Sequence, residues 1–446
     1  MTAPAEHQPD LFGHPRGLWV LAASELWDRI SFKGMQAMLV LYMAGELLQP
    51  GKIERVAGFG AFRAGLEAMT GPLSAEALAA QIFGLYIALV TLTPIAGGYI
   101  GDRLTGRRVA VTMGALLMTA GHFALAFDRT FLPALLLLVL GVGLFKGNLT
   151  AQVKALYADG DRRQADAYQI YLIAVNLGGV IAPLLTGTLA SAWGWHAGFA
   201  AAGIGMLVGL VTYLSGSRVL PPERPRRISG PRQPLSPEER RHVTGLLLLW
   251  PFLIGFWIAQ SQVWNLYNLW VRDHVDRMVG GFEVPVPWFA SLDSFAPVVL
   301  APLVIGLWRW QARLGKEPRL LTKMALGCLF FASGAALLMA ASLSADRASM
   351  AWPVAFHFLS NLGWLFFVPV ETTVFAGESP ERWRGTMLGV ASLSVSAASL
   401  ISGRMGVLYE GVPPAQFWAV NAAIVGGTGL ALLVAAPLLR KRLASA

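Results

Sequence analysis

Four charged side chains inside the first long apolar segment constrain what this 446-residue chain can fold into. Residues 18–43 are mostly apolar, yet Glu25, Asp28, Arg29 and Lys33 lie within them. An ionised side chain at the centre of a bilayer costs about 2.5–3.5 kcal/mol on insertion scales, so these four are not expected to face lipid. Their spacing puts them on one side of an α-helix. That side is predicted to face protein or a water-filled cavity, which makes it a candidate functional site.

The composition is typical of a membrane protein, with 55% hydrophobic and 14% charged residues. Apolar segments of about 20 residues recur along the chain, and each is long enough to cross about 30 Å of hydrocarbon. About twelve spans are predicted, at residues 18–43, 79–101, 108–127, 131–155, 168–192, 197–215, 244–271, 287–310, 320–342, 350–376, 385–409 and 414–438. The chain is therefore predicted to be an all-α membrane protein without a soluble domain.

The net charge of +9 does not indicate nucleic-acid binding, because the basic residues gather in alternate loops. These are Arg103, Arg107, Arg108, Arg162, Arg163, residues 224–241, residues 309–316, Arg382, Arg384 and residues 440–442. With an even number of spans, the positive-inside rule places both termini in the cytoplasm. The N-terminus lacks the pattern of a cleaved signal peptide. We expect a multi-pass protein of a bacterial-type inner (plasma) membrane.

Nothing in the sequence indicates an enzyme. No catalytic triad spacing, metal-binding cluster or nucleotide loop stands out, and residues 143–147 lack the ending of a phosphate-binding loop. The one cysteine, Cys328, permits no internal disulfide. We therefore expect no metal and no cofactor, and a transporter of this kind would use an ion gradient or run downhill.

A basic, proline-rich stretch at residues 216–243 divides the spans into six and six. We interpret it as a cytoplasmic linker between a bundle at 1–215 and a bundle at 244–446, although an ordinary loop would look the same. A second interruption, residues 44–78, is expected to hold a short surface helix. Two six-helix bundles are the architecture of the major facilitator fold, in which the substrate site lies between the halves near the midplane.

The loop after the second span supports that fold. Residues 98–108 read GYIGDRLTGRR, which matches the major facilitator loop motif G-x-L-x-D-R-x-G-R-R. Its glycines permit a tight turn, and its aspartate can cap a helix or pair with a basic neighbour. A topogenic charge alone is the alternative. The motif residues are Gly98, Asp102, Arg103, Gly106, Arg107 and Arg108.

Several segments together resemble the proton-dependent oligopeptide transporter family over nearly the whole chain. Residues 25–35, ELWDRISFKGM, are similar to its motif E-x-x-E-R-F-x-Y-Y-G-M. Residues 143–148, GLFKGN, resemble G-x-F-K-P-N, and residues 171–183 resemble F-Y-x-x-I-N-x-G-x-x-I-A-P. Residues 287–293, PWFASLD, resemble the start of the eighth span, P-x-W-F-Q-S-L-N.

The chain also departs from this family at positions that line the family's peptide pocket. Asp28 replaces a longer acid, Phe32 and Lys33 replace two tyrosines, and Gln36 replaces an arginine. Further replacements are Thr91 for tyrosine, Ser261 for an acid, Asp293 for asparagine, Trp364 for glutamate and Ala391 for tryptophan. The resemblance implies that the scaffold is kept while much of the peptide-contacting surface is changed.

Depth along the helices brings the candidate coupling groups together. Glu25 to Arg29 lie about 10–17 Å from the inner end of span one, and Lys146 lies about 15 Å from the inner end of span four. We predict a cavity cluster of Glu25, Asp28, Arg29 and Lys146 that binds protons, consistent with the resemblance. A structural ion-pair network that locks the first bundle is the alternative.

In the second half, Asp293 or Glu371 is expected to replace the missing acid of span ten. A helix-dipole charge for Asp293 and a rim position for Glu371 are the alternatives. The full set of predicted substrate-binding residues is Phe32, Lys33, Gln36, Thr91, Lys146, Asn176, Gln262, Trp264, Asp293, Trp364 and Glu371. Two histidines within spans, His122 and His357, are interpreted as hydrogen-bonded interior residues rather than proton carriers.

These observations predict a proton-coupled symporter for di- or tripeptides or similar small zwitterions, which acts as a monomer in a lipid bilayer. A transporter of a non-peptide solute with an anionic group is the alternative, because the first-half cluster is rich in cations. A receptor or assembly scaffold on an inactive transporter fold is a third possibility.

Overall fold

The computed structural model is almost entirely helical and describes residues 10–158, 160–221, 235–344 and 346–443. Its α-helices are α1 Arg16–Tyr42, α2 Phe59–Thr70, α3 Ala75–Ile100, α4 Arg107–Ala124, α5 Phe131–Ala155, α6 Arg163–Trp193, α7 Trp195–Ser215, α8 Pro237–Gln262, α9 Leu266–His274, α10 Val286–Ala290, α11 Leu292–Arg313, α12 Leu320–Ser344, α13 Ala351–Glu378, α14 Arg384–Gly411 and α15 Pro414–Arg440. The short strands β1 Asp10–Leu11 and β2 His14–Pro15 pair antiparallel, as do β4 Met278–Val279 and β5 Phe282–Glu283, while β3 Val275–Asp276 and β6 Ala348–Ser349 pair in parallel.

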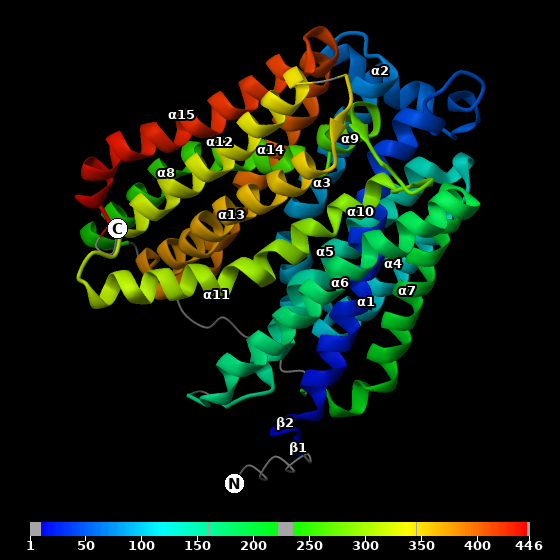
Figure 1. Ribbon diagram of the computed structural model, residues 1–446. Coiled ribbons are helices and arrows are strands. Elements are labelled where there is room, and N and C mark those ends of the chain that lie inside the picture. The colour runs from blue at the N-terminus through cyan, green and yellow to red at the C-terminus, as the bar shows by residue number, and fades with distance from the viewer. Residues whose placement is uncertain (1–9, 159, 222–234, 345, 444–446) are drawn as a thin grey trace. The chain divides into compact units, whose positions relative to one another are not determined.

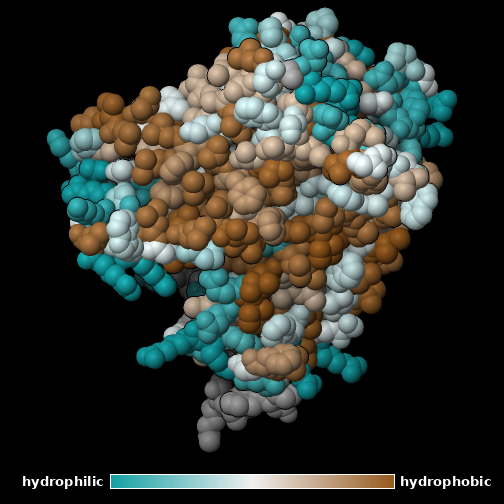
Figure 2. Space-filling model, in the orientation of Figure 1, coloured by the Kyte–Doolittle hydropathy of each residue, from teal (hydrophilic) through white to brown (hydrophobic). Residues whose placement is uncertain are grey.

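Ten stretches of described helix are long and apolar enough to cross a membrane. Helices α1 and α4 are the other two of the twelve expected. Four charged residues make α1 too polar to be recognised as a span by hydropathy, and α4 is short and begins with two arginines. The predicted surface helix between the first two spans is confirmed as α2. On the face that Figure 2 shows, hydrophobic side chains cover the helices and hydrophilic ones gather near helix ends and loops.

The chain forms two compact units. Unit 1 comprises Met1–Met38, Arg55–Phe59 and Leu92–Ser229, and unit 2 comprises Leu39–Glu54, Gly60–Thr91 and Gly230–Ala446. The first part of α3 thus packs with the second half of the chain, which a division into two sequence halves does not anticipate. The division at a linker over 216–243 stays a prediction, and its central part lies outside the described residues. Helix α8 begins at Pro237, inside the predicted linker, with a capping box in which the side chains of Ser236 and Glu239 accept hydrogen bonds from each other's backbone N–H.

In unit 1, α4 packs against α5 and α7, and α6 packs against α7 (Figure 1). Helix α1 lies along α6, because glycines remove side chains where the two helices meet. A Cβ atom on Gly178 of α6 would lie 2.6 Å from the Cβ atom of Arg29, and one on Gly34 of α1 would lie 2.5 Å from Thr186. These close contacts fix which residues of α6 face the charged stripe of α1.

In unit 2, α12 packs against α13 and α15, and α8 packs against α14 and α15 (Figure 1). Stacked aromatic rings lie between α8 and α13, where the Phe256 and Phe367 centroids are 3.9 Å apart. The predicted seventh span is interrupted, because α8 ends at Gln262 and α9 begins at Leu266. Non-helical backbone at membrane depth is tolerated where protein buries it or where it lines a cavity. The interruption therefore marks a place to look for function.

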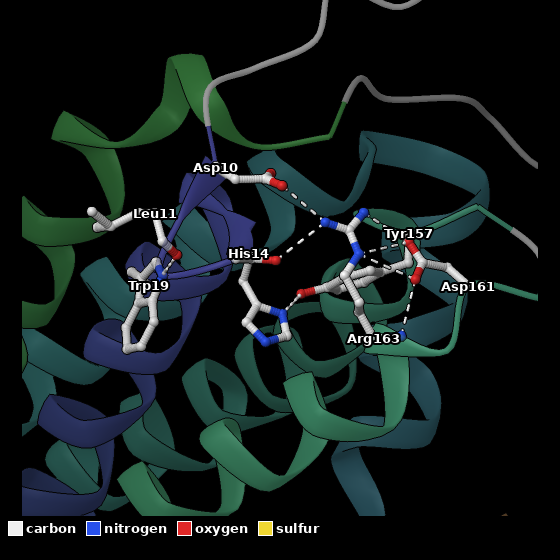
Figure 3. Close-up of polar contacts among 8 residues, drawn as sticks. Asp10, Leu11, His14, Trp19, Tyr157, Asp161 and Arg163 are labelled. Atoms are coloured by element: carbon white, nitrogen blue, oxygen red, sulfur yellow. Dashed lines mark hydrogen bonds and ion pairs between the residues drawn. The ribbon is translucent and has the colours of Figure 1, made fainter.

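The N-terminal hairpin β1–β2 is tied to the connection between α5 and α6 (Figure 3). Arg163 donates to Asp161 and, at 2.9 Å, to Asp10, while His14 Nδ1 lies 2.9 Å from the Tyr157 hydroxyl. Hydrogen bonds from Arg163 lower the pKa of Asp161. Partial burial raises the pKa of Tyr157 to about 12, so this phenol stays protonated at neutral pH. The contacts hold the start of α1 in place.

Candidate functional site: a buried charge cluster in each unit

The charged stripe of α1 forms a buried ion-pair cluster. Arg29 Nε lies 2.9 Å from Glu25 Oε1, and the Arg29 guanidinium also pairs with Asp28. All three side chains are less than 10% exposed. One guanidinium thus forms ion pairs with two carboxylates. In a low-dielectric interior, removal of one partner of such a group leaves an uncompensated buried charge.

A tyrosine of α6 completes this cluster. The Tyr171 hydroxyl donates to Glu25 Oε2 at 2.5 Å and lies 3.3 Å from Thr150 of α5. Tyr171 and Gly178 lie two turns apart on α6, and Glu25 and Arg29 lie one turn apart on α1, so the contact between the helices brings both pairs together. The sequence motif contained Tyr171, but its bond to Glu25 was not predicted.

Lys146 of α5 joins the cluster without an ion pair of its own. Its Nζ lies 4.7 Å from the centroid of the Phe32 ring, a cation–π geometry. The charges of Arg29, Asp28, Glu25 and Lys33 all act on it. Lys146 is partly exposed, and none of the ion pairs among the described residues includes it. The predicted grouping of Glu25, Asp28, Arg29 and Lys146 is therefore present, with Phe32 and Lys33 beside it.

The loop motif forms a compact turn at the end of α3. Gly106 has φ of 83°, a conformation that glycine adopts readily, and Arg107 Nε donates to Asp102 Oδ1 at 2.8 Å. Arg108 donates to the backbone carbonyl of Pro221 at 2.8 Å. The close packing falls on glycines other than the predicted Gly98, which has open space around it.

Asn148 of α5 belongs to the motif at residues 143–148, but its contacts were not predicted. Its amide donates to Gly97 O at 2.9 Å, and a Cβ atom on Gly101 would lie 2.0 Å from its Oδ1. It therefore fixes α5 against the end of α3 that carries the loop motif. Arg103, another motif residue, lies over the ring of Tyr99 at 5.7 Å.

The second cluster, in unit 2, surrounds Asp293 near the start of α11. Trp264, in the interruption between α8 and α9, donates from Nε1 to Asp293 Oδ2 at 3.0 Å. Asn361 of α13 donates to Asp293 Oδ1 at 3.4 Å. Both donors are uncharged, and none of the ion pairs among the described residues includes Asp293, which is partly exposed. The sequence predicted Trp264 and Asp293 separately, but not Asn361.

The other predicted substrate residues have different surroundings. Gln262 is buried and donates to Ser402 O at 3.4 Å, so it bridges α8 and α14. Thr91 and Asn176 bond to carbonyls of their own helices, Ile87 O and Leu172 O. None of these contacts by itself indicates a ligand, so their roles stay predictions.

Three more predicted residues lie on spans one and ten. Gln36 is buried on α1. Trp364 packs against an apolar group that includes Val304, Leu365 and Phe366. Glu371 is 6% exposed and lies near the Trp257 indole of α8, and its role stays a prediction.

Within the described residues, no group of three or more histidine, cysteine, aspartate or glutamate side chains is placed to hold a metal ion. The two clusters instead combine carboxylates, cations and neutral donors on helices that span a membrane. Such groups can bind protons and charged parts of a small solute. The fold and the clusters define a multi-pass membrane transport protein of the major facilitator type, not an enzyme.

Comparison with protein families gives a single assignment. The sequence model of the POT family matches residues 108–229 and 228–421. The chain belongs to this family, which confirms the resemblance found in its motifs.

Curated relatives match over nearly their whole length. The peptide transporter YePEPT of Yersinia enterocolitica subsp. palearctica serotype O:3 (strain YE-P4) is 28% identical, over 96% of this chain and 95% of its own. A di-/tripeptide transporter of Lactococcus lactis subsp. cremoris is 26% identical over 95% of each chain. Among solved structures, a mutant of the peptide transporter POT in complex with alafosfalin is 26% identical, with a TM-score of 0.83 over 98% of this chain and 97% of that one.

Proposed function

We propose that this chain is a proton-coupled symporter for di- or tripeptides or similar small zwitterions. The observation that carries the proposal is the buried cluster of Glu25, Asp28 and Arg29 beside the unpaired Lys146. Named peptide transporters among its relatives support the substrate class. The protein would act as a monomer in a bacterial inner membrane, with both termini in the cytoplasm as the basic loops indicate.

Protonation of Glu25 would change the balance of the unit 1 cluster. With a proton on Glu25, its attraction for Arg29 falls and the guanidinium pairs with Asp28 alone. The substrate's carboxylate would then find two cations, Lys146 and a partly released Arg29. A proton and an anionic group would thereby favour each other's binding, which is the differential affinity that symport requires.

Asp293 would bind the substrate's ammonium group. A carboxylate within a membrane span needs a positive charge nearby, and its present partners, Trp264 and Asn361, supply none. Glu371 is the less suitable acid, because it is buried beside an indole. Trp364, part of an apolar group, would contribute shape rather than charge.

Uptake into proteoliposomes tests this function. Under an inward proton gradient, dipeptide should accumulate above its external concentration, and a protonophore should abolish the accumulation while leaving exchange intact.

The unit 1 cluster, with three cations to two carboxylates, favours one alternative, a non-peptide solute with an anionic group. Accumulation of such a solute without uptake of any dipeptide would select that alternative. Absence of flux for every solute under any gradient would indicate a scaffold.

A further inference from the structure

Two histidines, His357 of α13 and His122 of α4, are fully buried without a hydrogen bond from the described residues to either ring nitrogen. Both are 0% exposed, and neither ring has a hydrogen-bond partner at Nδ1 or Nε2 among the described protein atoms. The expectation that they are hydrogen-bonded to protein is therefore wrong for the part of the chain that the structure describes. Because buried polar groups are nearly always paired, each exception needs a reason.

The two histidines differ in whether an acid lies near the ring. Among the described residues, the charge of Asp293 acts on His357, whereas no charged group acts on His122. Asn361, which donates to Asp293, follows His357 by four residues, so the two side chains share one face of α13. His357 and Asn361 therefore lie on the face of α13 that Asp293 contacts.

Aromatic rings enclose the His357 imidazole on its other sides. The Tyr267 ring of α9 lies edge-on at 5.2 Å, and Phe356 lies at 5.5 Å. Trp418 of α15 and Phe331 of α12 border the same rings without adding a titratable group. Asp293 and Tyr267 are thus the titratable groups that face this imidazole from the described neighbours.

We propose that His357 and Asp293 form a proton-binding pair that takes the place of a substrate's ammonium group. The proposal rests on the symport function argued above. An imidazolium beside Asp293 would balance that carboxylate, whereas a neutral imidazole leaves it without a positive partner. The proton comes from water and binds a ring nitrogen, and no other bond changes. An amine-bearing substrate brings its own positive charge to Asp293, so it makes this proton unnecessary.

A consequence is that a substrate without an amine binds together with one more proton than its amine-bearing counterpart. Alanyl-alanine and N-propionyl-alanine are a matched pair, because they differ only in the amino group. Their dissociation constants would be measured between pH 5.5 and 7.5 on the full chain in nanodiscs, without a gradient. We expect the affinity for N-propionyl-alanine to fall more steeply with rising pH, by up to about tenfold more per pH unit.

Three variants test the assignment. His357→Gln should give both compounds the same pH slope, and the near-isosteric Asp293→Asn should do so as well if the histidine variant folds poorly. His122→Gln, the matched buried histidine, should keep the difference. Equal slopes in the parent protein, or a difference that survives in His357→Gln, would overturn the proposal. Binding of neither compound would instead contradict the proposed function.

Discussion

In unit 1 the carboxylates of Glu25 and Asp28 share the guanidinium of Arg29, whereas in unit 2 Asp293 accepts hydrogen bonds from an indole and an amide that carry no charge. The first cluster holds three cations, Arg29, Lys33 and Lys146, and two carboxylates, so it has one positive charge in excess. In the second, none of the ion pairs among the described residues includes Asp293. The contrast teaches that the two clusters differ in the sign of the charge in excess, which is positive in unit 1 and negative in unit 2.

Replacement of Lys146 should have the largest effect, because it removes a buried-cluster cation that none of the ion pairs among the described residues includes. We expect Lys146→Ala to lower dipeptide uptake by at least about 100-fold, the upper range for a lost charge-assisted hydrogen bond, while the protein still folds. Lys154→Ala, an exposed position on the same helix, is the control. Normal uptake with unchanged affinity would show that Lys146 is not part of the site.

The acids of unit 1 should separate proton coupling from binding. We expect Glu25→Gln and Asp28→Asn to reduce accumulation under an inward proton gradient by about tenfold or more and to leave downhill exchange much less affected. Both changes keep the side-chain shape and remove the charge that Arg29 balances. Counterflow in the same vesicles is the internal control. If both variants concentrate dipeptide as the parent does, these carboxylates are not the coupling groups.

Loss of charge at Asp293 should weaken binding of the amino end only. For Asp293→Asn we expect the affinity for a dipeptide at pH 7 to fall by about 10–100-fold, the range for a hydrogen bond to a charged group. Binding of its des-amino analogue at the same pH should change far less. Isothermal titration gives both values, and an equal loss for the two ligands would assign Asp293 a structural role.

The smallest effect is expected outside both clusters. Hydrogen bonds from Arg163 lower the pKa of Asp161 in the folded state, so its contribution to stability is present above its ordinary pKa and is lost as pH falls through the lowered value. Thermal unfolding of Asp161→Asn should therefore differ slightly from the parent at pH 7 and converge with it once the pH lies below the lowered pKa of the Asp161 carboxyl. Dipeptide uptake should stay within about twofold, as for most surface changes. A strong loss of uptake would give the N-terminal hairpin a direct part in transport.

Much of the fold could be predicted from the sequence, because apolar segments of span length identify membrane helices directly. The limits of α5, Phe131–Ala155, agree with the predicted 131–155. The interruption at residues 263–265 was not predicted, since an apolar run shows no break where tertiary contacts, such as the bond from Trp264 to Asp293, hold non-helical backbone.

The candidate site divides in the same way. The grouping of Glu25 with Lys146 could be predicted, because every α-helix rises by the same length per residue and the two side chains lie at the same distance from the inner ends of their helices. The hydrogen bonds of Tyr171 to Glu25 and of Asn361 to Asp293 were not predicted, because they depend on which faces of two helices meet. That choice is made by glycines such as Gly178, and nothing in the spacing of charges reports it.

The packing around Trp364 limits which side chains that position can hold. A glutamate there would meet the apolar residues Val304, Leu365 and Phe366. A carboxylate taken out of water without a partner costs free energy, so Trp364→Glu is expected to destabilise unit 2. The indole therefore ties ligand recognition at this position to the stability of the helices around it.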